Sequence, residues 1–138
     1  MNKTLFKKIK EMNLPIGKYV IFGSGPMGIR GLRECHDLDI LVTEDVFNDY
    51  KEKLDWKSKD FERDGRYVEM IEKDNIELYK IWGPGEWSDK ELIESAEIID
   101  GLPFARLDYF IKWKRISGRK KDLNDVKTIE EYIRDKNK

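Results

Sequence analysis

Residues 18–42 read KYVIFGSGPMGIRGLRECHDLDILV, and this stretch decides the fold. The apolar residues at 18–22 predict a short strand that runs directly into the glycine-rich segment 23–28. Pro26 suits the first turn of a helix that follows. A second strand is predicted over 37–42, and its nearly continuous apolar end indicates that it lies inside a sheet. The sequence therefore predicts two strands separated by a tight glycine turn and a helix.

The rest of the chain alternates irregularly between predicted helices and strands. Helices are expected at 3–12, 44–54, 107–117 and 122–135, with a shorter one that begins at a Ser88–Glu91 capping box. Strands at 66–72 and 76–82 are joined by a turn at 73–75, and a small hairpin is expected at 96–99 and 102–105. This order favours an α+β fold in which helices pack against a mixed β-sheet. We expect one domain over 1–138, with a core at about 18–105 and a helical segment at about 107–135.

Composition limits the classes of function. The 138 residues include 27 Lys and Arg against 28 Asp and Glu, and this net charge of −1 excludes a simple polycationic coat for nucleic acid. One cysteine provides neither a disulfide framework nor a paired CxxC zinc motif. No apolar run approaches the roughly 20 residues of a membrane helix, and the first residues lack the apolar segment of a signal peptide. We therefore expect a soluble, cytoplasmic protein with no membrane association.

Two aspartates, Asp37 and Asp39, open the second predicted strand. Residues at i and i+2 of a strand project from the same face, so both carboxylates point to one side of the sheet. Two neighbouring anions repel each other unless a cation lies between them, and Mg²⁺ prefers carboxylate and phosphate oxygens. The pair is therefore a candidate metal site for phosphoryl transfer. The alternative interpretation is two solvated aspartates at the start of a strand.

The segment 23–28 also matches the G-x-G-x-x-G pattern of dinucleotide-binding folds. In those folds a carboxylate about 20 residues further on lies at the end of the second strand and binds a ribose. Here the acids come sooner and begin the strand, so a dinucleotide site is not expected.

Gly23-Ser24, followed after twelve residues by Asp37-Leu38-Asp39-Ile40, resembles the signature of the nucleotidyltransferase superfamily that includes DNA polymerase beta. A second match lies at 114–126, where KRISGRKKDLNDV resembles a K-x-x-x-x-R-x-K-D-x-x-D segment. Small prokaryotic members carry that segment, including those related to abortive-infection toxins and some antibiotic nucleotidyltransferases. The resemblance covers about residues 18–133 and implies a minimal nucleotidyltransferase-like fold.

The resemblance also implies roles for the matching residues. Gly23 and Ser24 would hold triphosphate oxygens, because glycine removes the Cβ that would block a close approach to the backbone. Asp37 and Asp39 would be catalytic and would bind Mg²⁺ or Mn²⁺. Each of these roles is an expectation for the structure to examine.

The family uses a third carboxylate from a later strand, which binds metal and helps to deprotonate the attacking hydroxyl. Glu77 is the candidate for this metal-binding and catalytic role, since it lies between apolar residues in a predicted strand. Glu69 is the rival. In a purely structural alternative, Glu77 pairs with a lysine across its hairpin.

Basic residues provide candidates for substrate binding. Arg30 and Arg33 follow the glycine turn, and on a helix they would share one face from which to bind phosphate; ordinary surface arginines are the alternative. Three further candidates lie in the C-terminal match: Lys114, Arg119 and Lys121. Asp122 and Asp125 are expected to orient these cations or to cap the last helix.

Two further groups of residues are expected to be structural. Cys35 and His36 precede Asp37, but adjacent strand residues face opposite sides, so these residues do not readily share one metal ion. The tryptophans at 82, 87 and 113 could stack on a base, but packing in or around the core is the favoured interpretation.

Taken with the resemblance, these residues indicate an enzyme that transfers a nucleoside monophosphate from a nucleoside triphosphate to a hydroxyl and releases pyrophosphate. The acceptor could be tRNA or other RNA, a small molecule or a protein; a toxin paired with an antitoxin is one variant. A non-catalytic module of the same fold that binds nucleotide or RNA is the alternative. Relatives usually carry an additional helical domain, so a homodimer or a partner chain could complete the site.

Overall fold

The computed structural model describes residues 2–63 and 65–137. Its centre is a seven-stranded sheet with the order β3-β6-β7-β2-β1-β9-β8. These strands are β1 (Tyr19–Ile21), β2 (Leu38–Val42), β3 (Lys57–Ser58), β6 (Met70–Lys73), β7 (Ile76–Tyr79), β8 (Glu97–Ile99) and β9 (Leu102–Phe104). A separate two-stranded ribbon consists of β4 (Phe61–Arg63) and β5 (Arg66–Val68). The helices are α1 (Lys3–Met12), α2 (Gly25–Gly28), α3 (Glu44–Lys51), α4 (Asp89–Glu94), α5 (Leu107–Ser117) and α6 (Lys120–Lys136).

The sheet is mixed, as predicted, and β2 lies near its middle. β2 pairs antiparallel with β1 and parallel with β7, while β1 pairs parallel with β9. The β2–β7 register places Asp39 directly opposite Glu77. The predicted α+β class is therefore confirmed, and a parallel strand pair brings together two acids that lie far apart in the sequence.

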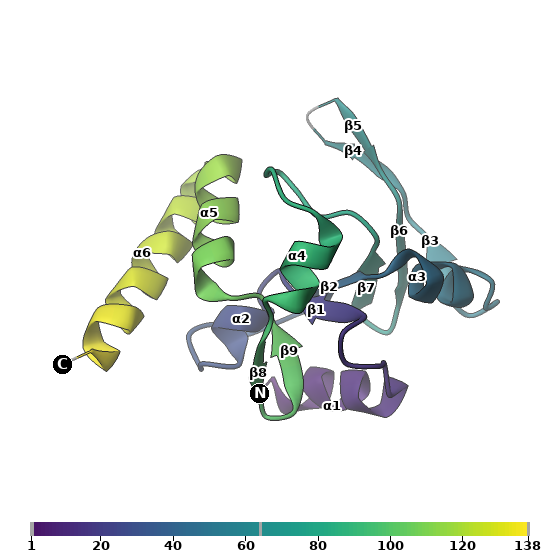
Figure 1. The fold of residues 1–138 in the computed structure, drawn as a ribbon, viewed down its shortest axis with the longest axis horizontal. Helices are drawn as coiled ribbons and strands as arrows, with labels where there is room; N and C mark the ends of the chain where they lie inside the picture. The colour runs from purple at the N-terminus through teal and green to yellow at the C-terminus, as the bar shows by residue number, and fades with distance from the viewer. Residues whose placement is uncertain (1, 64, 138) are drawn as a thin grey trace.

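Alternate residues of the central strands pack into two layers of core. Ile21 and Ile40 join the layer that contains α1 and α3, whereas Val20 and Leu41 join the layer that contains α4, α5 and α6. Figure 1 shows α1 on one side of the sheet, with α4, α5 and the β4–β5 ribbon on the other. Because side chains alternate along a strand, Asp39 projects to the same side as Leu41. The acids therefore face the helices and the ribbon.

Most helix bounds agree with prediction. The structure confirms 3–12 and 107–117, and Gly118, with a φ of 67°, ends α5 in the left-handed region that glycine tolerates. The Ser88–Glu91 capping box is present at the start of α4. The helix predicted over 44–54 ends earlier, at Lys51, and the last helix begins earlier, at Lys120.

Two predicted elements were wrong in detail. The single strand expected over 66–72 is divided into β5, which pairs with β4, and β6, which pairs with β3 and β7. The helix after the glycine turn is only four residues long and ends at Gly28. Glycines at 28 and 31 explain the early end, since Gly31 has a φ of 73°.

None of the helices among the described residues has the length and apolar character needed to span a membrane.

Candidate metal centre

Three carboxylates lie close together at the N-terminal ends of the parallel strands β2 and β7. Asp39 and Glu77 are side by side through the parallel register, and Asp37 immediately precedes β2. One oxygen from each of Asp37, Asp39 and Glu77 lies within 4.8 Å of the other two. Carboxylate oxygens in this arrangement are the ligands that hard divalent cations take. These three acids, which we call the acid cluster, could bind a metal ion.

The glycine turn packs directly against this cluster. Gly23 has a φ of 58°, and a Cβ at this position would lie only 2.6 Å from Oδ2 of Asp39. The backbone N–H of Phe22 donates to the carbonyl of Asp39 at 2.8 Å, and Ser24 Oγ donates to the carbonyl of Asp37 at 3.3 Å. The turn thus requires a residue without a side chain at position 23, both for backbone conformation and for space.

The acid cluster carries strong electrostatic repulsion. Burial and the neighbouring carboxylate of Glu77 raise the pKa of Asp39 to about 8, and the charge of Lys114 only partly opposes this rise. Burial and Glu77 also raise the pKa of Asp37. Like charges held this close disfavour the state in which all are ionised, unless a proton or a cation intervenes. The donor set and its electrostatics therefore both suit a divalent metal ion.

Tyr79 orients the third acid, and sequence reasoning did not single it out. Its hydroxyl donates to Oε1 of Glu77 at 2.8 Å, and the two residues lie two positions apart on β7. Burial raises the pKa of Tyr79, with the charge of Asp39 and the bond to Glu77 as further causes, so the hydroxyl keeps its proton. A polar aromatic residue at i+2 from a strand acid is the sequence signal that could have identified it.

Of the two candidates for the third acid, the structure brings Glu77 into the cluster. Glu69 instead forms ion pairs with Lys51 at 3.3 Å and Lys80 at 3.2 Å, and hydrogen bonds from these lysines lower its pKa. Across the hairpin, Glu77 lies opposite another acid, Glu72, and within the described residues it forms no ion pair with a lysine. Pairing with a lysine therefore does not account for its position.

A cavity of about 860 Å³ contains the acid cluster. Its size is within the range of sites for small molecules and cofactors. It is bounded by the glycine turn, by the β4–β5 ribbon and by the facing parts of α5 and α6. Six of the seven residues predicted to bind substrate line it: Gly23, Ser24, Arg33, Lys114, Arg119 and Lys121.

Most of the cations on the α5–α6 side of the cavity are already paired. Lys114 is buried and lies 3.2 Å from Asp122 and 3.1 Å from Asp125, and Asp125 also binds Arg33. Burial raises the pKa of Asp122, but hydrogen bonds from Arg119, Ser117 and Lys114 outweigh this effect and hold it below its usual range. At the start of α6, Asp122 also accepts a hydrogen bond from the backbone N–H of Arg119 at 3.3 Å. The expectation that the two aspartates orient the cations or cap the helix is confirmed: both pair with cations, and Asp122 also caps α6.

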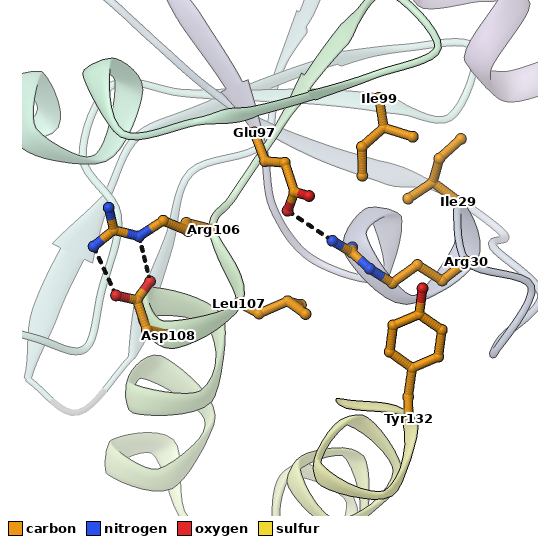
Figure 2. A pocket seen from close by; sticks show the side chains of 8 residues that line it. All are labelled: Ile29, Arg30, Glu97, Ile99, Arg106, Leu107, Asp108 and Tyr132. Atoms are coloured by element: carbon orange, nitrogen blue, oxygen red, sulfur yellow. Dashed lines mark hydrogen bonds and ion pairs between the residues drawn. The ribbon is translucent and has the colours of Figure 1, made fainter. Parts of the chain in front are cut away.

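Arg30 lies away from the acid cluster. Because α2 ends at Gly28, Arg30 and Arg33 do not share a helix face, and that expectation was wrong. Arg30 lines a second cavity of about 560 Å³, where it binds Glu97 at 2.9 Å and lies beside Tyr132 (Figure 2). The structure thus separates Arg30 from the other residues predicted to bind substrate.

Of the residues expected to be structural, Cys35, Trp82 and Trp113 are buried, whereas Trp87 is half-buried and His36 is exposed. Cys35 is buried, and a Cβ at Gly28 would lie only 2.3 Å from its sulfur. Trp82 and Trp113 are buried and pack with Phe22 between the sheet and α5, although both also line the main cavity. In the described structure, the Nε1 of Trp82 is buried without a hydrogen-bond partner. Trp82 and Trp113 thus form part of the apolar wall of the cavity.

The site thus combines an acid cluster, a glycine turn in contact with it and several cations around one cavity. Comparisons with models of protein families, with curated proteins and with solved structures found no significant match. Chemically, the arrangement suits an anionic ligand that is bound partly through a divalent metal ion and partly through basic side chains.

Proposed function

We propose that the protein is a metal-dependent nucleotidyltransferase, which transfers a nucleoside monophosphate from a nucleoside triphosphate to a hydroxyl acceptor. In the reaction, the acceptor oxygen forms a bond to the α-phosphorus, the bond to the β-phosphate oxygen breaks, and pyrophosphate leaves. The observation that carries the proposal is the convergence of Asp37, Asp39 and Glu77 within 4.8 Å, against the turn at Gly23. The resemblance in sequence described above, which includes these residues and a second match at 114–126, supports it.

In this proposal the acid cluster holds Mg²⁺ or Mn²⁺. The bound metal would stabilise charge that develops on the phosphate oxygens and would assist ionisation of the acceptor hydroxyl. Glu77, which accepts a hydrogen bond from Tyr79, would accept the proton of that hydroxyl. Each acid thus serves as a ligand, and Glu77 has a second role as a base.

The remaining residues would position the substrate. The backbone at Gly23 and the hydroxyl of Ser24 lie next to the acids and would donate to phosphate oxygens, for which the Ser24 hydroxyl would exchange its long bond to the carbonyl of Asp37. Lys121 lines the cavity without an ion pair to any described carboxylate, so it is available to bind an anion. Lys114 is held by two aspartates and acts through its charge and packing rather than as a mobile phosphate ligand.

The test is metal-dependent binding and turnover of nucleoside triphosphates. Calorimetry with each common triphosphate, with Mg²⁺ and with EDTA, is combined with an assay for released pyrophosphate. We expect Asp39→Asn to reduce metal-dependent binding and turnover by about 100-fold or more, because it removes the negative charge of one of three carboxylate ligands. The matched control is Asp135→Asn, an exposed aspartate on α6 that lies outside the cavity.

Full activity of a folded Asp39→Asn protein would contradict the proposal. Triphosphate binding that is the same with EDTA as with Mg²⁺ would also contradict it. Metal-dependent binding that never releases pyrophosphate, with RNA or small hydroxyl compounds as acceptors, would favour the alternative of a binding module.

A further inference from the structure

The β4–β5 ribbon forms one wall of the cavity although it lies outside the main sheet. It rises from the same face of the sheet as α5, at the end of the sheet away from α5 and α6, so the cavity lies between the ribbon and these helices (Figure 1). Phe61, Arg63, Arg66 and Val68 are among the ribbon residues that line the cavity, and Phe61 and Val68 pack at the edge of the core. The ribbon is therefore part of the same cavity as the acid cluster.

The register of the ribbon places two arginines directly opposite each other. Phe61 pairs with Val68 and Arg63 pairs with Arg66 in the antiparallel ladder. Since side chains alternate along a strand, these four residues share one face. Phe61 contacts the ring of Tyr79 edge-on, at 6.5 Å between centroids, so this face is turned toward the acid cluster.

The two guanidinium groups are held in defined places. Arg63 lies over the ring of Phe61 at 5.4 Å, and its charge partly opposes the rise in the pKa of Tyr79. Nη1 of Arg66 lies 3.7 Å from the position that a Cβ of Gly83 would occupy, so its side chain reaches toward the loop at the other edge of the cavity. Both cations thus face the space beside the acids.

Like charges directly opposite each other on a ribbon are unfavourable. Within residues 2–63 and 65–137, neither Arg63 nor Arg66 forms an ion pair with a carboxylate that would compensate this repulsion. Five other arginines do form such pairs: Arg30, Arg33, Arg106, Arg115 and Arg119. A pair of uncompensated guanidinium groups on a cavity wall is suited to an anion that both can bind, and bidentate geometry favours phosphate.

We propose that Arg63 and Arg66 form a phosphate-binding site on the ribbon wall of the cavity. The identity of the anion rests on the proposed function, in which two substrates can supply phosphate. It belongs either to the nucleoside triphosphate or to the backbone of a single-stranded polynucleotide that serves as the acceptor. In both cases the ribbon holds a substrate against the acid cluster from the side opposite α5 and α6.

The test compares the double variant Arg63→Gln/Arg66→Gln with the wild type and with Arg134→Gln. Arg134 is an exposed arginine near the end of α6 that lies outside the cavity, so it controls for the loss of positive charge. One arm measures binding of a single-stranded RNA oligonucleotide in EDTA at several salt concentrations. The other arm measures binding of ATP with Mg²⁺ by calorimetry, and circular dichroism verifies the fold of every variant.

If the phosphate is the acceptor's, the double variant binds RNA about 10-fold or more weakly, and the slope of log K against log[salt] falls by about 1.4. ATP binding is then unchanged. If the phosphate is the nucleotide's, ATP binding weakens about 10-fold or more and RNA binding is unchanged. Either result, with a normal Arg134→Gln control, supports the site. Loss of neither binding activity, or equal loss in the control, overturns it.

These outcomes are distinguishable from failure of the proposed function. RNA binding in EDTA does not depend on the acid cluster, so it can require Arg63 and Arg66 even if no triphosphate is ever turned over. Conversely, Mg²⁺-dependent turnover that is insensitive to both arginines would leave the enzyme assignment in place and remove the phosphate site from the ribbon.

Discussion

Replacement of Asp39 by asparagine should stabilise the metal-free protein at neutral and alkaline pH. Burial and the carboxylate of Glu77 raise the pKa of Asp39 from 3.8 to about 8 in the folded state. The folded protein therefore binds more protons than the unfolded chain between these two values. Stability that is fully present below pH 4 is lost as the pH rises toward 8. Asparagine does not ionise, so the variant escapes this loss.

The magnitude follows from the shift. One pKa unit corresponds to about 1.4 kcal/mol, so a rise from 3.8 to about 8 corresponds to at most about 6 kcal/mol above pH 8. Water in the cavity and small movements of the three side chains relieve part of the repulsion. We therefore expect a gain of about 2–4 kcal/mol for Asp39→Asn at pH 8, and little difference at pH 4.

The assay is urea denaturation at pH 4, 6 and 8, in EDTA and in saturating Mg²⁺. The wild type in EDTA should lose stability across this range, while Asp39→Asn should change less and Asp135→Asn should follow the wild type. Mg²⁺ should stabilise the wild type most at pH 8, because a bound cation compensates the ionised cluster. Wild-type stability in EDTA that does not fall between pH 4 and pH 8, together with no gain in Asp39→Asn, would refute this reasoning.

Three further substitutions test other parts of the site. Gly23→Ala places a Cβ 2.6 Å from the Asp39 carboxylate at a φ of 58°, so it should cost about 1–3 kcal/mol in urea denaturation and weaken Mg²⁺ binding in calorimetry. Tyr79→Phe removes the hydrogen bond to the third acid, and calorimetry should show Mg²⁺ binding that is about 10-fold weaker or more, with the fold retained. Asp125→Ala leaves the buried Lys114 with one carboxylate fewer and should destabilise the protein by about 3–5 kcal/mol in thermal or urea denaturation, with no dependence on Mg²⁺.

Local patterns in the sequence predicted the elements that depend on local interactions. The apolar run from Ile40 to Val42 marked a central strand, the Ser88 capping box marked α4, and Gly118 marked the end of α5. Asp37 and Asp39 could be recognised as a pair because their spacing matches the alternation of a strand. These features need no knowledge of which segments meet in space.

Other features depend on contacts between distant segments and could not be read from spacing. The position of Glu77 beside Asp39 follows from the register of β2 with β7, which no local pattern encodes. The ribbon was not predicted as such: β5 was merged with β6 into one strand, and β4 was missed because it is short, largely exposed and rich in charge. The helix expected to contain Arg30 was extended too far because glycine tolerates both helix and turn.

The buried ion pairs of Lys114 make the cavity wall formed by α5 and α6 stiffer than the wall formed by the β4–β5 ribbon. Movement of α5 away from α6 would leave the buried Lys114 without its two carboxylate partners, which costs several kcal/mol. The ribbon instead joins the sheet near Met70, through hydrogen bonds with the backbone of Lys59 and the side chain of Asp60. We therefore expect the cavity to accommodate ligands of different width by bending of the ribbon where it joins the sheet, while α5 and α6 keep their positions.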